Sequence, residues 1–188
     1  VAVFSMEMGA SQLAIRIVGS IGRIDQTHLR TGRLTDEEWP RLTEAIEKLR
    51  NVSLHIDETP GLTTSELRAN ARRLARQSGK LGLIVVDYLQ LMDGDGESRA
   101  QELTKIARGL KRLAKELNCV VMVLSQLSRE ADKTDSPPRL DHLAESGGIE
   151  QAADVIGLLW REARRKPKPG NEHTAQIELV KNKNGATC

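Results

Sequence analysis

Hydrophobic residues along this chain fall into two kinds of pattern, which together predict alternating strands and helices. Residues 1–5, 82–87 and 119–126 are short, nearly continuous apolar runs rich in β-branched residues. Such runs are typical of parallel-sheet strands that are buried on both faces. The segments 9–24 and 98–117 instead repeat an apolar residue every three or four positions. That spacing predicts amphipathic helices with one face on the core.

Helix-start signals predict where further helices begin, after Thr35 and after Thr63, and where the helix at 9–24 begins. Thr35-x-x-Glu38 and Thr63-x-x-Glu66 are both capping-box patterns, in which two side chains satisfy the first free backbone N–H groups of a helix. For the helix at 9–24, Ser11 is the residue that we expect to act as the cap, because a serine hydroxyl accepts well from those N–H groups.

The order of elements predicts the fold class. Residues 52–57 alternate like a strand, 127–148 are a polar loop segment, and 154–160 and 174–180 are further strands joined through a basic loop. Helices and strands alternate over the first two thirds of the chain, which indicates an α/β domain with a mostly parallel sheet flanked by helices. The two late strands are expected to form an antiparallel edge.

Composition changes this picture little, but it narrows the function classes. The chain has 188 residues, of which 29% are charged and 39% hydrophobic, which is ordinary for a soluble globular domain with a real core. A net charge of +2 does not by itself indicate a nucleic-acid partner, and 2% aromatics argue against a base-stacking surface. Two cysteines favour a reducing compartment, and no apolar stretch is long enough to cross a membrane.

Three predicted strands end in polar residues, and this is the strongest signal for a functional site. The strand at 1–5 leads to Glu7, the strand at 82–87 ends in Asp87, and the strand at 119–126 ends in Ser125 and Gln126. Ligands of open α/β sheets bind beyond the carboxyl ends of the strands. A carboxylate pair and an amide at that edge suit a divalent metal, an activated water and an anionic substrate.

Each of these residues also has a plainer interpretation. Asp87 could be a helix cap or a solvated turn residue, Glu7 a surface residue, and Gln126 a loop residue that hydrogen bonds its neighbours. Their coincidence on three strands favours a site, but the spacing does not identify the reaction.

Several stretches resemble bacterial replicative DNA helicases of the DnaB type. LGLIVVDYLQLM resembles their Walker B strand, FSMEM the strand end with their catalytic glutamate, and VVMVLSQLSRE their sensor strand. ESGGIEQAADVI and VKNKNG match later motifs of the family in the right order. The resemblance extends along almost the whole chain.

The resemblance implies a RecA-like ATPase core that works as a cytoplasmic homo-hexamer encircling single-stranded DNA. It also implies ATP and Mg²⁺ as substrate and cofactor, and a primase and a helicase loader as partners. On this basis Asp87 holds Mg²⁺ through water, Glu7 polarises the attacking water, and Gln126 senses the γ-phosphate.

One departure from the family concerns the P-loop, G-x-x-x-x-G-K-[ST], which cradles phosphates with backbone amides. The pair Gly79-Lys80 is followed by Leu81, and GDGESR at 94–99 lacks the last glycine of G-x-G-x-x-G. In the family the P-loop lies just before the strand that here begins at Val1. We therefore expect 1–188 to be a single partial RecA-like domain, without the P-loop and the N-terminal domain, that does not hydrolyse ATP alone.

A second departure lies after the last strand. The family usually has Lys-x-Arg-Asn-Gly, whose arginine reaches the γ-phosphate of the neighbouring subunit, whereas this chain has Lys181 and Lys183 at the two basic positions. Lysine keeps the charge but lacks the planar, bidentate fork of arginine. A surface turn is the plainer interpretation.

The DNA-facing loop departs as well. Where the family often has Arg-Glu-Ser-Gly, this chain places Ala144 before Glu145, Ser146, Gly147 and Gly148. Backbone amides there can still meet a phosphate, since glycine allows close approach. Arg139 is a substitute for the missing arginine, and a simple glycine turn is the alternative.

Two further stretches are basic. Arg68, Arg72 and Arg76 lie on one face of a predicted helix, and the segment 164–168 is a basic loop. Both suit a solvated surface, and the loop alternatively adds affinity for DNA. The preferred function is a DNA-translocating motor. A RecA-like ATPase with another role and a non-catalytic oligomerisation or DNA-binding module are the alternatives.

Overall fold

The computed structural model describes residues 1–143 and 147–187. Its helices are α1 (Ala10–Gly22), α2 (Gln26–Thr31), α3 (Glu38–Arg50), α4 (Thr64–Ser78), α5 (Arg99–Leu117) and α6 (Gly147–Ala152). Its strands are β1 (Ala2–Ser5), β2 (His55–Asp57), β3 (Leu83–Asp87), β4 (Val120–Val123), β5 (Val155–Trp160) and β6 (Gln176–Asn182). Short 3₁₀ turns include η1 (Leu89–Leu91) and η3 (Leu140–His142). The predicted α/β class is confirmed.

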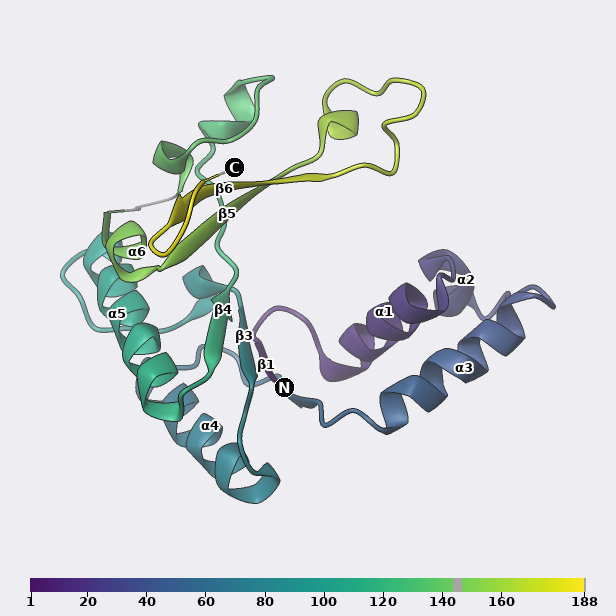
Figure 1. The fold of residues 1–188 in the computed structure, drawn as a ribbon, viewed down its shortest axis with the longest axis horizontal. Helices are drawn as coiled ribbons and strands as arrows, with labels where there is room; N and C mark the ends of the chain where they lie inside the picture. Colours follow the sequence, from purple (N-terminus) through teal and green to yellow (C-terminus); the bar gives the residue numbers. More distant parts are fainter. Residues whose placement is uncertain (144–146, 188) are drawn as a thin grey trace.

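The strands form two separate sheets. Four parallel strands are ordered β2-β1-β3-β4, with Ala2 beside both His55 and Ile84, and Ile84 beside Val121. β5 and β6 pair with each other in an antiparallel ribbon. The late strands are therefore antiparallel as predicted, but within the described residues they do not form an edge of the main sheet. Figure 1 shows this ribbon above the carboxyl ends of β3 and β4.

Helices α4 and α5 cover one face of the four-stranded sheet (Figure 1). Phe4, Ile84 and Val86 are fully buried against them, together with Leu67 of α4 and other apolar residues of both helices. The capping box at Thr63 forms in full, so α4 begins where the sequence predicted. This helix pair and sheet make the main core of the protein.

The opposite face of the same sheet is only partly covered. Buried and half-buried positions alternate along β3, and on β4 the exposed fractions of Val120 and Met122 are 62% and 50%. Leu124, just beyond β4, is 45% exposed. The prediction that these runs are buried on both faces is therefore wrong for the described residues, because no described helix packs on that second face.

Helices α1, α2 and α3 form a lobe that projects away from the sheet (Figure 1). α1 packs along α3 and against α2. Glu38, only 5% exposed, accepts hydrogen bonds from the Thr35 backbone N–H at 2.9 Å and contacts the His28 ring at 2.9 Å. Half of the predicted box at Thr35 thus forms. The Thr35 backbone and His28 lower the pKa of Glu38 below its usual value.

The β5–β6 ribbon has a small core of its own, and it attaches to the sheet body through α6 and α5. Leu143, Ile156 and Leu158 are its buried residues. At the junction Gly148 of α6 meets α5 so closely that a Cβ on Gly148 would lie 1.9 Å from Thr104 Oγ1. Among the described residues, none of the helices has the length and apolar character needed to cross a membrane.

Candidate functional site

The carboxyl ends of β1, β3 and β4 meet at one edge of the sheet. Ser5 pairs with Asp87 in the register of β1 and β3, and the Met6 backbone N–H donates to the Asp87 carbonyl at 2.9 Å. On the other side of β3, the Leu124 N–H donates to the Val86 carbonyl at 3.0 Å. The polar strand ends that the sequence singled out therefore lie at the same edge.

The end of β1 is shaped by a buried serine. Ser5 is 1% exposed, and its hydroxyl donates to the Met8 carbonyl at 2.8 Å and accepts from the Met8 N–H at 3.3 Å. These bonds curl the loop so that Glu7 is exposed at its tip. Sequence reasoning identified Glu7 but missed the serine that shapes its loop.

A second acidic residue beside this loop was also missed. Glu58, which follows β2, accepts a hydrogen bond from the Ala10 backbone N–H at 2.6 Å and so caps α1. Ser11 makes no such bond, and the residue at the cap position is Gly9. The prediction that Ser11 caps this helix is therefore wrong, because a carboxylate from a distant strand satisfies the helix start instead. Glu58 is an acidic residue at the end of a predicted strand, as Asp87 is, and this position was the signal in the sequence that could have identified it.

Asp87 ends β3 and is half-buried. The turn that follows, η1, has Tyr88 at its cap position and no side-chain cap. Asp87 is thus not a helix cap, which removes one of the plainer interpretations. Within residues 1–143 and 147–187, no side chain bonds to its carboxylate. A half-buried carboxylate at a sheet edge is suited to hold a hydrated cation.

The end of β4 is tied to the end of β3 by a residue that the sequence pattern did not single out. The Gln90 amide nitrogen donates to Ser125 Oγ at 2.9 Å, and its oxygen accepts from the Gln126 backbone N–H at 3.2 Å. Gln126 itself is exposed. A polar residue between Leu89 and Leu91 was the signal for this contact.

Lys181 lies near the end of β6 and Lys183 directly follows that strand, and both ammonium groups are held by residues in or just after α6. Lys183 pairs with Asp154 at 3.3 Å, Lys111 of α5 contacts the same carboxylate, and Lys181 donates to the Glu150 carbonyl. The hydrogen bond from Lys111 and then that from Lys183 hold the pKa of Asp154 below its ordinary value. Neither Lys181 nor Lys183 contacts Glu7, Asp87 or Gln126 among the described residues.

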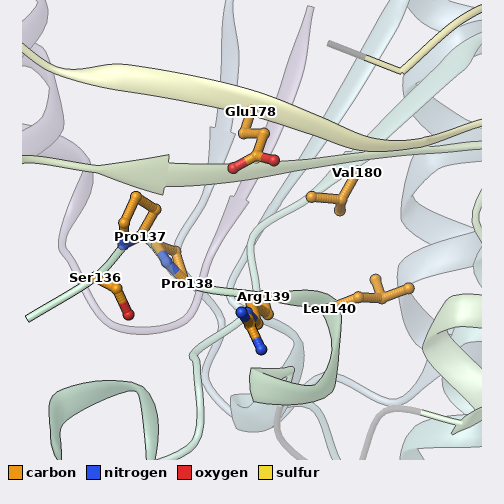
Figure 2. A pocket seen from close by; sticks show the side chains of 7 residues that line it. All are labelled: Ser136, Pro137, Pro138, Arg139, Leu140, Glu178 and Val180. Atoms are coloured by element: carbon orange, nitrogen blue, oxygen red, sulfur yellow. The ribbon is translucent and has the colours of Figure 1, made fainter. Parts of the chain in front are cut away.

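The candidate DNA-binding residues fall into three groups. Arg139 is exposed and lines a shallow cavity of about 280 Å³ between the loop before η3 and β6. Figure 2 shows Glu178 of β6 on the opposite side of that cavity, so a phosphate entering it would also meet a carboxylate. Glu145 and Ser146 lie outside the described residues. Gly147 and Gly148 begin α6, and Gly148 is buried against Thr104.

The basic stretches are partly neutralised within the chain. Arg68 and Arg72 of α4 both pair with Glu116 of α5. In the loop between β5 and β6, Arg165 pairs with Asp132 at 2.7 Å and Lys166 with Asp135 at 3.5 Å. The pairing supports the interpretation of these stretches as ordinary protein surface more than as dedicated nucleic-acid sites.

Comparison with known proteins gives consistent matches. The family described as "DnaB-like helicase C terminal domain" matches residues 1–188. The "Replicative DNA helicase DnaC" of Bacillus subtilis (strain 168) is 45% identical over 189 residues, and the "Replicative DNA helicase DnaB" of Geobacillus stearothermophilus is 44% identical. Each match covers 98% of this chain and 41% of the relative, so the chain spans less than half the length of these relatives.

Two solved structures agree with these relatives. One is titled "The Structure Of A DnaB-Like Replicative Helicase And Its Interactions With Primase" and superposes with a TM-score of 0.93 at 30% identity, covering all of this chain and 46% of that one. The other, "ATPase Domain of G40P", gives a TM-score of 0.92 at 30% identity and covers 68% of that chain. The four-stranded body and the ribbon therefore both occur in known helicase structures.

Proposed function

The chain belongs to the family of DnaB-like helicase C-terminal domains, and we propose that it is the motor part of a replicative DNA helicase. In this role it binds ATP and couples its hydrolysis to movement along single-stranded DNA in the cytoplasm. The observation that carries the proposal is the meeting of Glu7, Asp87 and Gln126 at one edge of a parallel sheet. Phosphoryl transfer depends mainly on such positioning and charge.

Asp87 is the residue that would hold Mg²⁺. Its carboxylate fits a hard cation that prefers oxygen ligands, and Mg²⁺ in phosphoryl-transfer sites is bound by one or two carboxylates together with water and phosphates. Among the described residues no group of three or more acidic, histidine or cysteine side chains is placed to hold a metal ion, so the proposal rests on the single carboxylate of Asp87. When bound, Mg²⁺ neutralises charge on the phosphate oxygens.

Glu7 is proposed to orient and polarise the attacking water. It stands exposed on the loop that Ser5 fixes, beside the strand that ends in Asp87. Gln126 is proposed to contact the γ-phosphate and to transmit its presence to the loop that follows β4. Its exposed position at the start of that loop supports this role.

The phosphate cradle is the part of the proposed site that the 188 residues do not contain, since no G-x-x-x-x-G-K-[ST] occurs in them. We propose that the phosphate cradle, together with a strand and a helix, packs beside β4, which is an edge strand of the four. The exposed apolar residues Val120, Met122 and Leu124 support that placement, because burying them would be favourable. The domain described here is then part of a larger RecA-like domain.

Lys181 and Lys183 are proposed to act in trans, at the γ-phosphate bound by the neighbouring subunit of a homo-hexamer. Each lysine would exchange its present partner, the Glu150 carbonyl or Asp154, for a phosphate oxygen. Such an exchange keeps a charge-assisted hydrogen bond at each step. Lysine gives a single point of contact, so we expect weaker activation than arginine would give.

For DNA we propose backbone contacts from Glu145, Ser146, Gly147 and Gly148, with Arg139 as a phosphate contact nearby. The low aromatic content supports contacts to the phosphate backbone over base stacking. A primase and a helicase loader are the proposed protein partners, and the structural neighbour described with its interactions with primase supports the first of them.

The test uses a grafted helicase, in which these 188 residues replace the matching segment of the Bacillus subtilis relative. Asp87→Asn in the grafted helicase should lower ATP turnover by about a hundredfold or more, because it removes the charge that holds the cation. Asp95→Asn, on an exposed loop, is the matched control and should leave turnover unchanged. Equal turnover in both variants would contradict the proposed site.

The alternatives give different results in the same assay. A grafted helicase that hydrolyses ATP but unwinds no DNA would favour a RecA-like ATPase with another role. One that assembles and binds DNA without any turnover would favour a non-catalytic oligomerisation or DNA-binding module.

A further inference from the structure

The Gln90 side chain makes a two-point contact across the ends of β3 and β4. Its amide N–H donates to the Ser125 hydroxyl at 2.9 Å, and its amide oxygen accepts from the Gln126 backbone N–H at 3.2 Å. We propose that Gln90 is a positioning residue, which fixes the backbone of Gln126 so that this residue can report on the γ-phosphate. The role rests on the function proposed above and adds a residue to it.

The Gln90 amide makes a contact that requires both a hydrogen-bond donor and an acceptor. The last backbone hydrogen bonds between the two strands run from the Leu124 N–H to the Val86 carbonyl at 3.0 Å and from the Leu89 N–H to the Leu124 carbonyl at 2.9 Å. Among the described residues, no later backbone hydrogen bond joins these two segments. A glutamine side chain carries a donor and an acceptor, as a peptide group does, so Gln90 continues the ladder where the backbone no longer can.

The turn that carries Gln90 is itself firmly held. The Arg99 guanidinium, at the start of α5, donates to the carbonyls of Gln90 at 2.8 Å and Met92 at 3.1 Å, and it also pairs with Glu102. Leu89 and Met92 are 1% exposed and anchor the same turn in the core. Gln90 is thus the fixed side of the contact, whereas Gln126 is exposed and begins a polar loop.

This arrangement gives Gln126 a defined place relative to Asp87. Gln90 lies three residues after Asp87, and its turn is packed into the core beside the strand that ends there. Without the amide, the Gln126 backbone would lose its side-chain contact to the β3 end and would be held only by its neighbours, such as Ser128, whose N–H donates to the His142 carbonyl at 2.7 Å. Nucleotide would then still bind at the sheet edge, but the alignment that hydrolysis requires would be lost, and misplacement of a reacting group lowers the rate steeply.

The contact is tested first in the 188-residue chain. Gln90→Met keeps the length of an unbranched side chain but removes both hydrogen bonds. Hydrogen exchange of the Gln126 amide, followed by NMR, should become about three- to tenfold faster, which corresponds to the loss of one ordinary hydrogen bond. Gln77→Met, on the exposed side of α4, should leave it unchanged. An unchanged Gln126 amide in Gln90→Met would overturn the contact.

The positioning role is tested in the grafted helicase. Gln90→Met should lower kcat for ATP by about ten- to hundredfold while KM stays the same, because nucleotide binding does not need Gln126 in place. Ser125→Ala should add little to Gln90→Met, since the two residues share one contact. Gln77→Met should match the unsubstituted protein.

The outcomes separate the two proposals. An active grafted helicase in which Gln90→Met leaves kcat unchanged overturns the positioning role alone. An unsubstituted grafted helicase without any turnover overturns the proposed function and, with it, the role assigned to Gln90. Faster exchange at Gln126 together with a lower kcat supports both.

Discussion

The four-stranded sheet and the β5–β6 ribbon are held in place by different forces. The sheet rests on a cluster of 14 buried apolar residues that includes Phe4 and Leu67, whereas the ribbon has three, of which Leu158 is the most buried. The ribbon relies more on charged contacts, such as those of Asp154 with Lys111 and Lys183. Exposed ion pairs are screened by salt and are lost when their carboxylates are protonated, whereas apolar contacts carry no charge to screen or protonate.

The difference matters because the two regions carry different parts of the proposed site. Asp87 ends a strand of the packed sheet, and Glu7 and Gln126 lie on the exposed loops that follow the neighbouring strands. Lys181 lies in β6 of the ribbon, and Lys183 directly follows it. The residues proposed to act within one subunit thus follow strands that are anchored in the apolar core. Lys181 and Lys183, which are proposed to act on the neighbouring subunit, are held by partly exposed polar contacts whose loss costs little free energy.

The largest expected effect comes from breaking the sheet core. Phe4→Ala, at a fully buried position, should lower the free energy of unfolding by about 3–5 kcal/mol through lost burial and an empty cavity. Ile177→Ala on the ribbon, where the side chain is 70% exposed, should change it by less than about 0.5 kcal/mol. Urea denaturation measures both, and equal effects would contradict the contrast between the regions.

The next effect concerns the junction between sheet body and ribbon. Gly148→Ala places a Cβ against Thr104 of α5, and such overpacking should cost about 1–3 kcal/mol. Gly147→Ala is the matched control, because among the described residues beyond its chain neighbours no atom lies within 4 Å of its added Cβ. Should both substitutions leave the free energy of unfolding unchanged, α6 does not pack on α5 as described.

A smaller effect is expected from the charged contacts of the ribbon. Asp154→Asn removes the carboxylate that two lysines share, and exposed pairs of this kind contribute less than about 1 kcal/mol. Amide exchange in β5 and β6 should accelerate, and added salt should accelerate it in the parent chain but not in Asp154→Asn. Amides of β1 and β3 serve as the internal reference and should respond to neither change.

The smallest effect is confined to acid pH. Because lysine contacts hold the pKa of Asp154 below its usual value of 3.8 in the folded protein, its contribution to stability is present above pH 3.8. That contribution is lost as pH falls below 3.8 through the lowered pKa. NMR between pH 5 and about 2.5 should show the Lys183 amide losing protection in the parent chain. A titration of the same shape in Asp154→Asn would assign the change to another carboxyl group.

Local patterns were sufficient to predict much of the body of the protein. The capping box at Thr63 and the apolar spacing of 98–117 gave α4 and α5 because both signals act within a single helix. The polar residues at the strand ends predicted correctly that these residues lie at one edge of the sheet, because parallel strands share one direction. The roles of Glu7, Asp87 and Gln126 in catalysis stay predictions.

The features that sequence reasoning missed depend on what lies opposite in space. Whether a strand such as β3 is covered on its second face depends on other segments, which its own periodicity does not describe. Glu58 caps α1 across 48 residues of sequence, and Gln90 reaches Gln126 across 36. No local pattern carries such contacts, although a lone polar residue within an apolar run marks a position to inspect.

The position of β1 in the sheet sets the order in which this protein can assemble during synthesis. Ala2 pairs with His55 and with Ile84, so β1 leaves the ribosome long before either neighbour. The α1–α3 lobe lies between β1 and β2 and packs on itself, which lets it fold first and shorten the loop that must close. The acidic sheet edge therefore comes into existence only once the chain beyond Asp87 has emerged, and until then β1 has at most β2 as its partner and keeps one edge open to other chains.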